Sequence, residues 1–497
     1  MSVLLVCLGF AATVYAEAPP LYVMQFGTAG TGNGQFNLPT GIAFDSSGNI
    51  LISDYDNHRI QKFSSSGAYL SQFGSYGNGD GQFNRPTGIA VDSSGNIWVA
   101  DNINRRIQKF SSSGTYISQF GTLGTGNGQF KLPYGINFDS SGNLWVADGT
   151  NHRVQKFDSN GIYLSQLGTL GTGNGQFYDP YAVTFDGSGN IWVADTWNHR
   201  VQKFSSSGTY ISQFGSSGTG NVQFNLPMGI ASDSSGNIWV ADCRNHRVQK
   251  FDSAGNYLSQ FGTSGTGNGQ FNQPEYIAVD SSGDIWVTDT YNNRVQKFTK
   301  ATRVIGTSGS LAFGDVIVNK TKQLGFTVSN TGNSALTVSS VSYPAGFSGN
   351  WNGGTIVAGG SQAVTVTFSP TAVQLYSGTV TVISDKTGGT DTLVISGNCI
   401  SDPCSYTDTN GSTQQGIDLV KANPGSYQLF TQAQNDAARQ AGIQFCKDNP
   451  ASCGLLSQAQ SDQAVKNEQL KWDANGDGKI GLEDIIRMLQ VIAGLRP

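Results

Sequence analysis

The chain has 497 residues and a net charge of −5, and its Lys and Arg residues recur mostly within one repeated word, R-[IV]-Q-K. This length exceeds what a single hydrophobic core supports and predicts three or more modules. Without a cluster of cations a phosphate-binding surface is not expected, which argues against a nucleic-acid partner. Beyond the N-terminus no run of 18 apolar residues occurs, so we expect no membrane span in the mature protein.

The N-terminal segment, residues 1–18, has the pattern of a secretory signal peptide. An apolar run from Val3 to Val14 precedes a small-residue cleavage pattern that ends at Ala16. Such a segment is removed on export and does not belong to the folded mature protein. The expected location is extracellular or at the cell surface, although the basic residues that usually open a signal are missing.

A repeat of 47 residues dominates the next part of the chain. Each copy has an Asp that opens a D-x-S-G-[ND] turn, and these are Asp45, Asp92, Asp139, Asp186, Asp233 and Asp280. The clearest copy, Gly175–Gly215, contains four β-rich runs separated by Gly, Asn, Ser and Pro. Four antiparallel strands cannot bury both faces alone, and closing several copies into a ring leaves only short edges. Six copies at this period predict a six-bladed β-propeller in a mainly β protein.

The repeated wording, P-x-x-[IV]-x-x-D…G-[ND]-[IL]-x-[IV]-[AST]-D-x-x-N-[HRN]-R-[IV]-Q-K-F, resembles the NHL repeat. The resemblance covers roughly residues 21–304, and we place the propeller at 19–304. Four copies have His after Asn, whereas Arg105 and Asn293 replace it in the other two. The resemblance implies the fold and leaves the function open, because folds of this kind host enzymes, RNA binders and sensors.

The two ends of the repeat region suggest how the ring closes. Leu21–Phe26 has the wording of an outer strand, but the rest of its blade is missing, while the sixth copy lacks a good outer strand. We therefore predict that Leu21–Phe26 completes blade six. The alternative is that Thr302–Ile305 forms a shortened outer strand there and the N-terminal strand is spare.

Residues present in every copy are expected to be structural. A Trp in five copies should pack between blades, and an Asp and an Arg five positions apart should fix a tight turn by hydrogen bonding. The His residues are interpreted as hydrogen-bonding turn residues, since equivalent positions around a ring would not converge on one zinc ion. The Asp and Arg series are Asp54, Asp101, Asp148, Asp195, Asp242 and Asp289, and Arg59, Arg106, Arg153, Arg200, Arg247 and Arg294.

Specificity is expected where the copies differ, at the mouth of the central channel. The residue after the repeated Pro varies, and aromatic side chains gather there on blades three, four and six. A concave apolar surface with few polar groups is the default ligand site, and exposed rings suit sugars or peptide side chains. The alternative is neutral variation at tolerant loop positions. The candidate ligand-binding residues are Tyr134, Tyr178, Tyr181, Trp197, Glu275, Tyr276 and Tyr291.

Residues 305–400 read as an all-β sandwich of Ig type. Six alternating strands follow one another between Ser310 and Cys399, separated by turn clusters. The words F-G-D-V at Phe313–Val316, S-N-T-G at Ser329–Gly332 and F-S-P at Phe368–Pro370 resemble bacterial Ig-like domains of the ASPM–SPD2–hydin group. That resemblance implies a spacer or assembly module in a bacterial protein.

Residues 401–471 are predicted to form a helical linker with an internal repeat of 26 residues. Two cysteine pairs, Cys399 with Cys404 and Cys446 with Cys453, are spaced as local loops and are either disulfides or free thiols. Cys243 is then left over in a blade turn, where it is interpreted as a tolerated substitution.

The C-terminal segment, residues 472–497, contains the most specific chemical motif, DANGDGKIGLED at Asp473–Asp484. Its oxygen-bearing residues stand at the spacing of a Ca²⁺-binding loop, and we predict one Ca²⁺ site there. The ligands would be Asp473, Asn475, Asp477, the carbonyl of Lys479, and Asp484. Asp at the last position resembles a dockerin repeat rather than an ordinary EF-hand. The resemblance implies a cohesin-like partner, although dockerins usually carry two such loops and one is convincing here.

These patterns favour a secreted, non-catalytic binding or scaffold protein that presents a propeller face to a carbohydrate or protein ligand. The alternative is an extracellular metal-dependent lyase that uses the same face, a reaction suggested by resemblance to secreted propeller lyases. Against it, no His stands outside the repeat and no catalytic set can be nominated. A ubiquitin-ligase or translational-repressor scaffold does not fit the signal peptide or the absence of zinc-binding Cys and His spacing.

Overall fold

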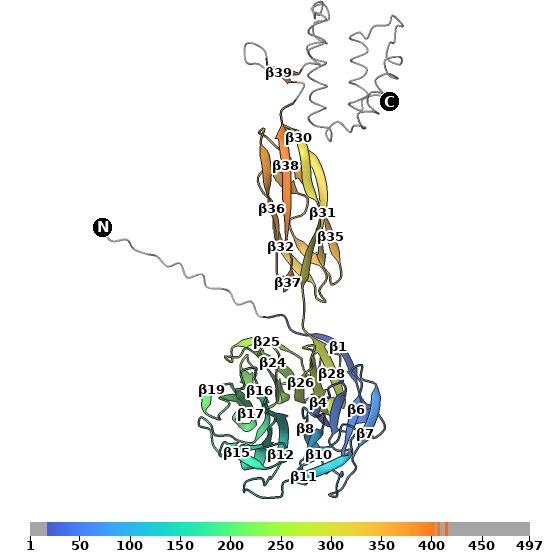
Figure 1. Ribbon diagram of the computed structural model, residues 1–497, viewed down its shortest axis with the longest axis vertical. Coiled ribbons are helices and arrows are strands. Elements are labelled where there is room, and N and C mark those ends of the chain that lie inside the picture. Colours follow the sequence, from blue (N-terminus) through green and yellow to red (C-terminus); the bar gives the residue numbers. More distant parts are fainter. Residues whose placement is uncertain (1–16, 403–404, 408–412, 416–497) are drawn as a thin grey trace, which may run out of the picture. The chain divides into compact units, whose positions relative to one another are not determined.

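The computed structural model describes residues 17–402, 405–407 and 413–415. Within this part the chain forms a β-propeller and a β-sandwich (Figure 1). The predicted signal peptide up to Ala16, nearly all of the predicted helical linker and the predicted Ca²⁺ loop lie outside the described residues.

Each blade of the propeller is a four-stranded antiparallel sheet, numbered here in chain order of the inner strands. The inner strands are β4 (Pro39–Phe44), β8 (Pro86–Val91), β12 (Pro133–Phe138), β16 (Pro180–Phe185), β22 (Pro227–Ser232) and β26 (Pro274–Val279). The second strands are β5 (Ile50–Asp54), β9 (Ile97–Asp101), β13 (Leu144–Asp148), β17 (Ile191–Asp195), β23 (Ile238–Asp242) and β27 (Ile285–Asp289). The third strands are β6 (Arg59–Phe63), β10 (Arg106–Phe110), β14 (Arg153–Phe157), β18 (Arg200–Phe204), β24 (Arg247–Phe251) and β28 (Arg294–Thr299). The outer strands are β7 (Tyr69–Phe73), β11 (Tyr116–Phe120), β15 (Tyr163–Leu167), β19 (Tyr210–Phe214), β25 (Tyr257–Phe261) and β1 (Leu21–Phe26).

Shorter elements lie between these strands. Two-residue strands form two small parallel pairs, and single turns of 3₁₀ helix follow four of the second strands. They are β2 (Thr28–Ala29) with β3 (Gln35–Phe36), β20 (Ser216–Ser217) with β21 (Gln223–Phe224), η1 (Gly149–Asn151), η2 (Thr196–Asn198), η3 (Cys243–Asn245) and η4 (Thr290–Asn292).

The ring closes through the N-terminal strand. Each inner strand contacts the next one around the ring, and β26 contacts β4. Strand β1 pairs antiparallel with β28, with Gln25 opposite Gln296, and the Gln25 side chain accepts a hydrogen bond of 2.7 Å from Arg294. This confirms that Leu21–Phe26 completes blade six. The alternative outer strand is wrong, because β29 (Val304–Gly309) pairs with β31 (Lys322–Asn330) in the sandwich.

Hydrogen bonds from the repeated Asp form the turn after each inner strand. In blade two, Asp92 Oδ1 accepts from the backbone N–H of Ser94 and of Asn96, at 3.0 and 2.8 Å. Gly95 in the same turn has a φ of +83°, a conformation that glycine adopts without steric cost. The D-x-S-G-[ND] pattern is therefore explained by the geometry of one tight hairpin turn.

The repeated Trp and the Asp–Arg pair have the structural roles expected of them. Trp98 packs edge-on against Phe138 of the next blade, with ring centroids 5.8 Å apart. Arg106 Nε donates a 2.7 Å hydrogen bond to the buried carboxylate of Asp101, and its Nη2 donates to two backbone carbonyls of the preceding loop. Both predictions are confirmed, and the same Asp–Arg bond occurs in all six blades.

The repeated His residues join successive blades. Each accepts, on Nδ1, a hydrogen bond from the backbone N–H of the residue before the Pro of the next inner strand; the donors to His58, His152, His199 and His246 are Arg85, Asp179, Leu226 and Gln273. Asn293 Oδ1 serves Leu38 in the same way, at 2.9 Å. All five donor residues have φ between +52° and +60°. A residue before proline is normally extended, so this strained backbone is compensated by the His or Asn acceptor. The interpretation of these His residues as structural is confirmed.

The sandwich consists of two five-stranded sheets, ordered β33-β35-β31-β29-β37 and β30-β38-β36-β32-β34. Rings of Phe313, Phe347 and Phe368 pack together in its core, with centroids 4.6 to 5.5 Å apart. The six strands expected from the sequence are present. The remaining bounds are β30 (Leu311–Ile317), β32 (Leu336–Ser342), β33 (Phe347–Gly349), β34 (Gly354–Ile356), β35 (Ser361–Phe368), β36 (Leu375–Ser384), β37 (Gly388–Gly389), β38 (Thr392–Ile400), and a hairpin of β39 (Ser405–Thr407) and β40 (Thr413–Gln415).

Candidate functional site

One face of the propeller is built from two kinds of loop, as expected. The turn between the second and third strands of a blade meets the connection that leads into its inner strand: in blade one, the N–H groups of Tyr55 and Asp56 donate to the carbonyls of Leu38 and Asn37, at 3.3 and 3.0 Å. We call this surface the mouth face. It carries the residue after each repeated Pro, together with the turn residues that vary between blades.

An exposed pair of aromatic rings on blade four, with the carboxylate between them in sequence, forms what we call the Trp197 platform (Tyr178, Asp179 and Trp197). The Trp197 and Tyr178 side chains are 51% and 46% exposed, and their rings are tilted by 31° with centroids 6.0 Å apart. Trp197 Nε1 donates a 3.1 Å hydrogen bond to Asp179 Oδ2. The indole is thereby held in one orientation although half of its surface faces solvent.

The backbone of Asp179 is fixed by blade three. Its N–H donates to His152 Nδ1 at 3.1 Å, and the His152 ring packs edge-on against Tyr178 at 5.5 Å. Burial raises the pKa of the Asp179 carboxyl, and the hydrogen bond from Trp197 opposes that shift. The platform is therefore preorganised by the neighbouring blade.

Behind the platform, three tyrosines and one acid meet across the channel at the mouth face; we call this group the aromatic plug (Tyr134, Tyr181, Glu275 and Tyr276). Tyr134 stacks on Tyr181 with centroids 4.6 Å apart, and Tyr181 lies 5.3 Å from Tyr276. The Tyr181 hydroxyl donates a 2.8 Å hydrogen bond to Glu275 Oε2. The plug thus joins blades three, four and six across the channel.

Burial dominates the ionisation of the plug. It raises the pKa of Glu275 from 4.5 to about 7, while the hydrogen bond from Tyr181 works in the opposite direction. Burial likewise raises the pKa of Tyr134 and of Tyr181, so both hydroxyls stay protonated at neutral pH. The plug therefore holds a carboxyl group that changes charge near pH 7.

A glycine connects the platform with the plug. A Cβ atom added to Gly149 would lie 2.4 Å from both Asp179 Oδ1 and a ring carbon of Tyr134. Both side chains consequently pack directly on the Gly149 backbone. Residues from blades three and four form one continuous surface from Trp197 inward to the plug.

The structure divides the seven candidate ligand-binding residues into groups. Tyr178 and Trp197 lie on the exposed platform. The four plug residues are less accessible: two are half-buried, and Tyr181 and Tyr276 are only 8% exposed. Tyr291 is 48% exposed, and among the described residues its ring contacts no aromatic ring of the platform or the plug. Tyr134, Tyr181 and Tyr276 are less accessible because their rings pack on one another and Tyr181 bonds to Glu275. A ligand-binding role for the seven residues stays a prediction.

Sequence reasoning missed Tyr55 and interpreted Cys243 only as a tolerated substitution; both residues follow the strand-ending Asp of their blades. In blades two, four and six the side chain at this position donates to the Pro carbonyl of the next blade, from Asn102, Thr196 and Thr290. Cys243 is buried instead, and burial, reinforced by the nearby Glu275, raises the pKa of its thiol. Variation at this position of the repeat was the available signal.

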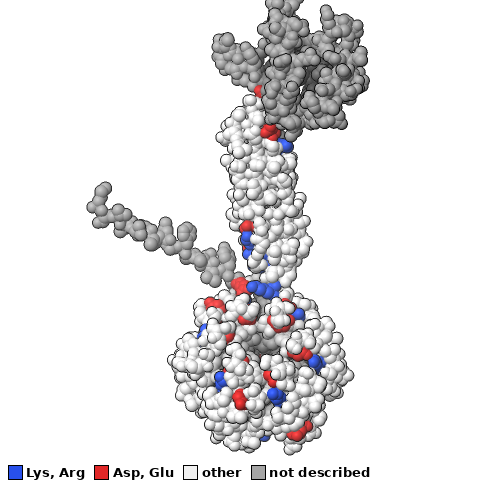
Figure 2. All heavy atoms as spheres, in the orientation of Figure 1, with Lys and Arg blue, Asp and Glu red and all other residues white. Residues whose placement is uncertain are grey.

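No group of three or more His, Cys, Asp or Glu side chains that could hold a metal ion occurs among the described residues. The predicted Ca²⁺ ligands, from Asp473 to Asp484, lie outside them, as do Cys404, Cys446 and Cys453. Cys399 is buried in the sandwich. In the view of Figure 2, basic and acidic side chains are interspersed on the propeller. No helix in the described ranges is long and apolar enough to cross a membrane.

Comparisons with known proteins identify two kinds of module. NHL repeat models match residues 36–63, 83–110, 130–157, 177–204, 224–251 and 271–298. A HYDIN/CFA65/VesB-like Ig-like domain matches residues 307–398. The chain therefore contains six NHL repeats and a HYDIN-like Ig domain, and these confirm the repeat and sandwich assignments.

Among curated proteins, the B-box type zinc finger protein ncl-1 of Caenorhabditis elegans is 43% identical over 47 residues, which is 10% of this chain. The match spans only 6% of that protein.

Solved structures that resemble part of this chain include the following three. A streptogramin B lyase is 16% identical with a TM-score of 0.41, covering 56% of this chain and 97% of its own. A gluconolactonase from Xanthomonas campestris is 15% identical with a TM-score of 0.42, covering 57% and 99%. A Bacteroides thetaiotaomicron protein of unknown function is 19% identical with a TM-score of 0.44, covering 56% and 76%. The similarity concerns the fold alone.

Proposed function

We propose that this chain is a non-catalytic binding protein that recognises a carbohydrate on the Trp197 platform. The observation that carries the proposal is the exposed pair of Trp197 and Tyr178 rings, held in place by Asp179. An exposed ring that is already fixed loses little conformational entropy when a ligand stacks on it. The apolar C–H face of a sugar ring fits such a surface, and its hydroxyls remain available to polar groups at the rim.

The other modules fit a role in presenting the propeller. We propose that the Ig-like domain acts as a spacer, that the chain is secreted, and that Asp473–Asp484 binds Ca²⁺. The last two parts rest on the sequence patterns of the signal peptide and of the loop. A cohesin-like partner for the C-terminal segment is a further prediction from the dockerin resemblance.

Calorimetric titration of the full chain with neutral hexaoses of the cello-, xylo-, chito- and malto-series tests the proposal. We expect one series to bind, and Trp197→Ala to weaken it at least about tenfold, a loss of about 1.4 kcal/mol. Tyr291→Ala is the matched control, since Tyr291 occupies the same turn position in blade six and is equally exposed. Its affinity should equal that of the parent chain.

Two results would overturn the proposal. Binding that is equally sensitive to Trp197→Ala and Tyr291→Ala would show that the platform is not the site. Failure of every hexaose series to bind, together with Trp197-dependent capture of peptides from a random peptide library, would replace the carbohydrate with a protein ligand.

A further inference from the structure

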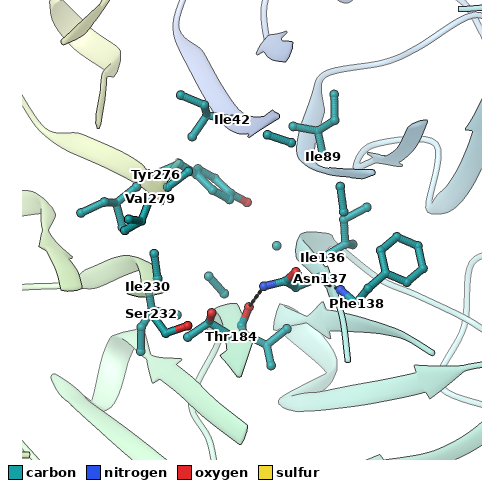
Figure 3. A pocket seen from close by; sticks show the side chains of 18 of the residues that line it. Ile42, Ile89, Ile136, Asn137, Phe138, Thr184, Ile230, Ser232, Tyr276 and Val279 are labelled. Carbon is teal, nitrogen blue, oxygen red and sulfur yellow. Dashed lines mark hydrogen bonds between the residues drawn. The ribbon is translucent and has the colours of Figure 1, made fainter. Parts of the chain in front are cut away.

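The central channel contains a cavity of about 390 Å³ beneath the aromatic plug (Figure 3). It is lined by the second halves of the six inner strands, from the level of Tyr276 toward the turns at the opposite face. Its size is within the usual range for small-molecule sites and corresponds to about a dozen water volumes. The cavity is separate from the Trp197 platform, which lies on the outer surface of the mouth face.

Four departures from the repeat converge on this cavity. Asn137 and Thr184 stand where the other four blades have Ala, and Ser232 stands where the others have Phe or Val. All three line the cavity on adjacent blades three, four and five. The other lining side chains are largely aliphatic, with Ile42 an example from blade one, although polar atoms contribute more of the surface that faces the cavity than apolar ones. The cavity consequently has a polar side and an apolar side, although the fold itself is nearly six-fold symmetric.

The fourth departure is Tyr276. The other five blades have Gly or Ala at its position, where neighbouring inner strands approach closely; a Cβ on Gly41 would lie 2.1 Å from the Thr87 carbonyl oxygen. The Tyr276 ring instead extends from its strand into the cavity (Figure 3). Its side chain is buried, and within the described part of the chain its hydroxyl has no hydrogen-bond partner. A buried hydroxyl without a partner costs about 1 to 3 kcal/mol, and an acceptor on a bound molecule would remove that cost.

The polar side has unused capacity as well. Asn137 Nδ2 has only a long bond of 3.5 Å to the carbonyl of Val183, and the Thr184 hydroxyl makes no hydrogen bond within the described part of the chain. Among the described residues, none that lines the cavity carries a charge. A charged ligand would lose its hydration without gaining a counter-charge, so the lining selects neutral molecules.

We propose that this cavity is a second ligand site, for a small neutral molecule with an apolar ring or chain and a carbonyl or ether oxygen. The oxygen accepts a hydrogen bond from Tyr276 Oη. The apolar part contacts the aliphatic side, and a second polar group on the ligand would pair with Asn137 or Thr184. The site binds and does not transform its ligand.

Ligand-observed NMR with the full chain tests this with cyclohexanone as the probe and cyclohexanecarboxylate as the charged control. We expect saturable binding of cyclohexanone in the millimolar range and none of the carboxylate. Tyr276→Phe keeps the ring and removes the hydroxyl, and it should lower the affinity for cyclohexanone at least threefold. Trp197→Ala, on the mouth face, should leave the affinity unchanged.

Tyr276→Phe could also weaken binding by disturbing the packing of the plug, so a second variant tests the cavity independently. Thr184→Leu fills part of the cavity and should abolish saturable binding while the circular dichroism spectrum stays that of the parent. Equal affinity in the parent, Tyr276→Phe and Thr184→Leu chains would overturn the proposal. Absence of saturable cyclohexanone binding to the folded parent chain would also overturn it, and would leave the cavity as a water-filled channel.

Discussion

The Nδ1 atom of His152 accepts a hydrogen bond from the backbone N–H of Asp179 across 3.1 Å and so joins blade three to blade four. The bond holds Asp179 at a φ of +54° immediately before Pro180. Blade two shows what happens without such an acceptor: Arg105 replaces the His, and Leu132, the corresponding residue before Pro133, does not adopt a positive φ. His152 therefore determines the backbone conformation of Asp179, whose carboxylate positions Trp197.

Replacing His152 with Ala should affect both stability and recognition. We expect a loss of about 1 kcal/mol in the free energy of unfolding, because one hydrogen bond to a strained backbone is removed. Ligand binding at the platform should weaken because Asp179 no longer fixes Trp197. His246→Ala is the control: it should cost similar stability and leave binding unchanged. Denaturant unfolding and sugar titration measure the two effects, and equal binding losses in both variants would contradict the positioning role.

His152→Asn should preserve most of what His152→Ala loses. Asn293 already fills this role for Leu38 with a bond of 2.9 Å. A free energy of unfolding close to that of the parent is expected for the Asn variant. If the Ala and Asn variants unfold alike, the side-chain acceptor is not what stabilises the turn.

Stability should depend on the ionisation of Glu275. Its pKa is about 7 in the folded protein and 4.5 as a reference value, so the folded state binds the proton more tightly. The stabilisation is fully present below pH 4.5 and is lost as pH rises through 7, with an upper limit of about 3 kcal/mol. Glu275→Gln should remove this part of the pH dependence and unfold at a higher temperature than the parent at pH 8.5. Melting curves at pH 5 and 8.5 decide this, and an unchanged pH dependence would place the ionised carboxylate in solvent.

The closure of the ring can be tested with two equivalent phenylalanines. Phe26 contacts Phe63 and Trp286 at 4.6 and 6.3 Å, and Phe73 occupies the corresponding position in the outer strand of blade one. Phe26→Ala and Phe73→Ala should each cost about 3 kcal/mol, because each leaves a cavity between two blades. A cost for Phe26→Ala below about 1 kcal/mol would show that β1 is not docked in solution.

Calcium binding is predicted from the sequence of the C-terminal loop. Saturable Ca²⁺ binding with a Kd of about 10⁻⁴–10⁻³ M is expected by calorimetry. Asp477→Ala should abolish it, because the variant loses a carboxylate ligand. Asp408→Ala is the control and should not, since Asp408 lies outside the motif Asp473–Asp484. Retention of binding in the Asp477 variant would place the ion elsewhere.

The repeat made most of the propeller predictable. Hydrophobic runs gave the strands, the position of Gln25 in the repeat register gave the closure, and invariance of the Asp–Arg pair pointed to a structural role. Each of these depends on contacts within a blade or on the period itself. They can be derived without knowing how far one blade lies from another.

The plug was not predictable in the same way. The Tyr181 hydroxyl bonds to Glu275, which is 94 residues away on a different blade, and no local pattern indicates that distance. Tyr276 was identified as variable, but its significance depends on the close approach of inner strands that makes Gly or Ala necessary elsewhere. Whether such a residue is exposed or buried depends on the side chains that face it across the channel.

The pairing of β1 with β28 means that the ring can close only late in synthesis of the chain. Gln25 leaves the ribosome early, yet its partner Arg294 lies 269 residues later. At about 5 to 20 residues per second, the first strand waits on the order of tens of seconds for its place in the last blade. Until then β1 is a lone strand with an unpaired edge, and any chain that terminates before blade six leaves it so. A complete propeller therefore has β1 paired in blade six, whereas a truncated one leaves β1 unpaired.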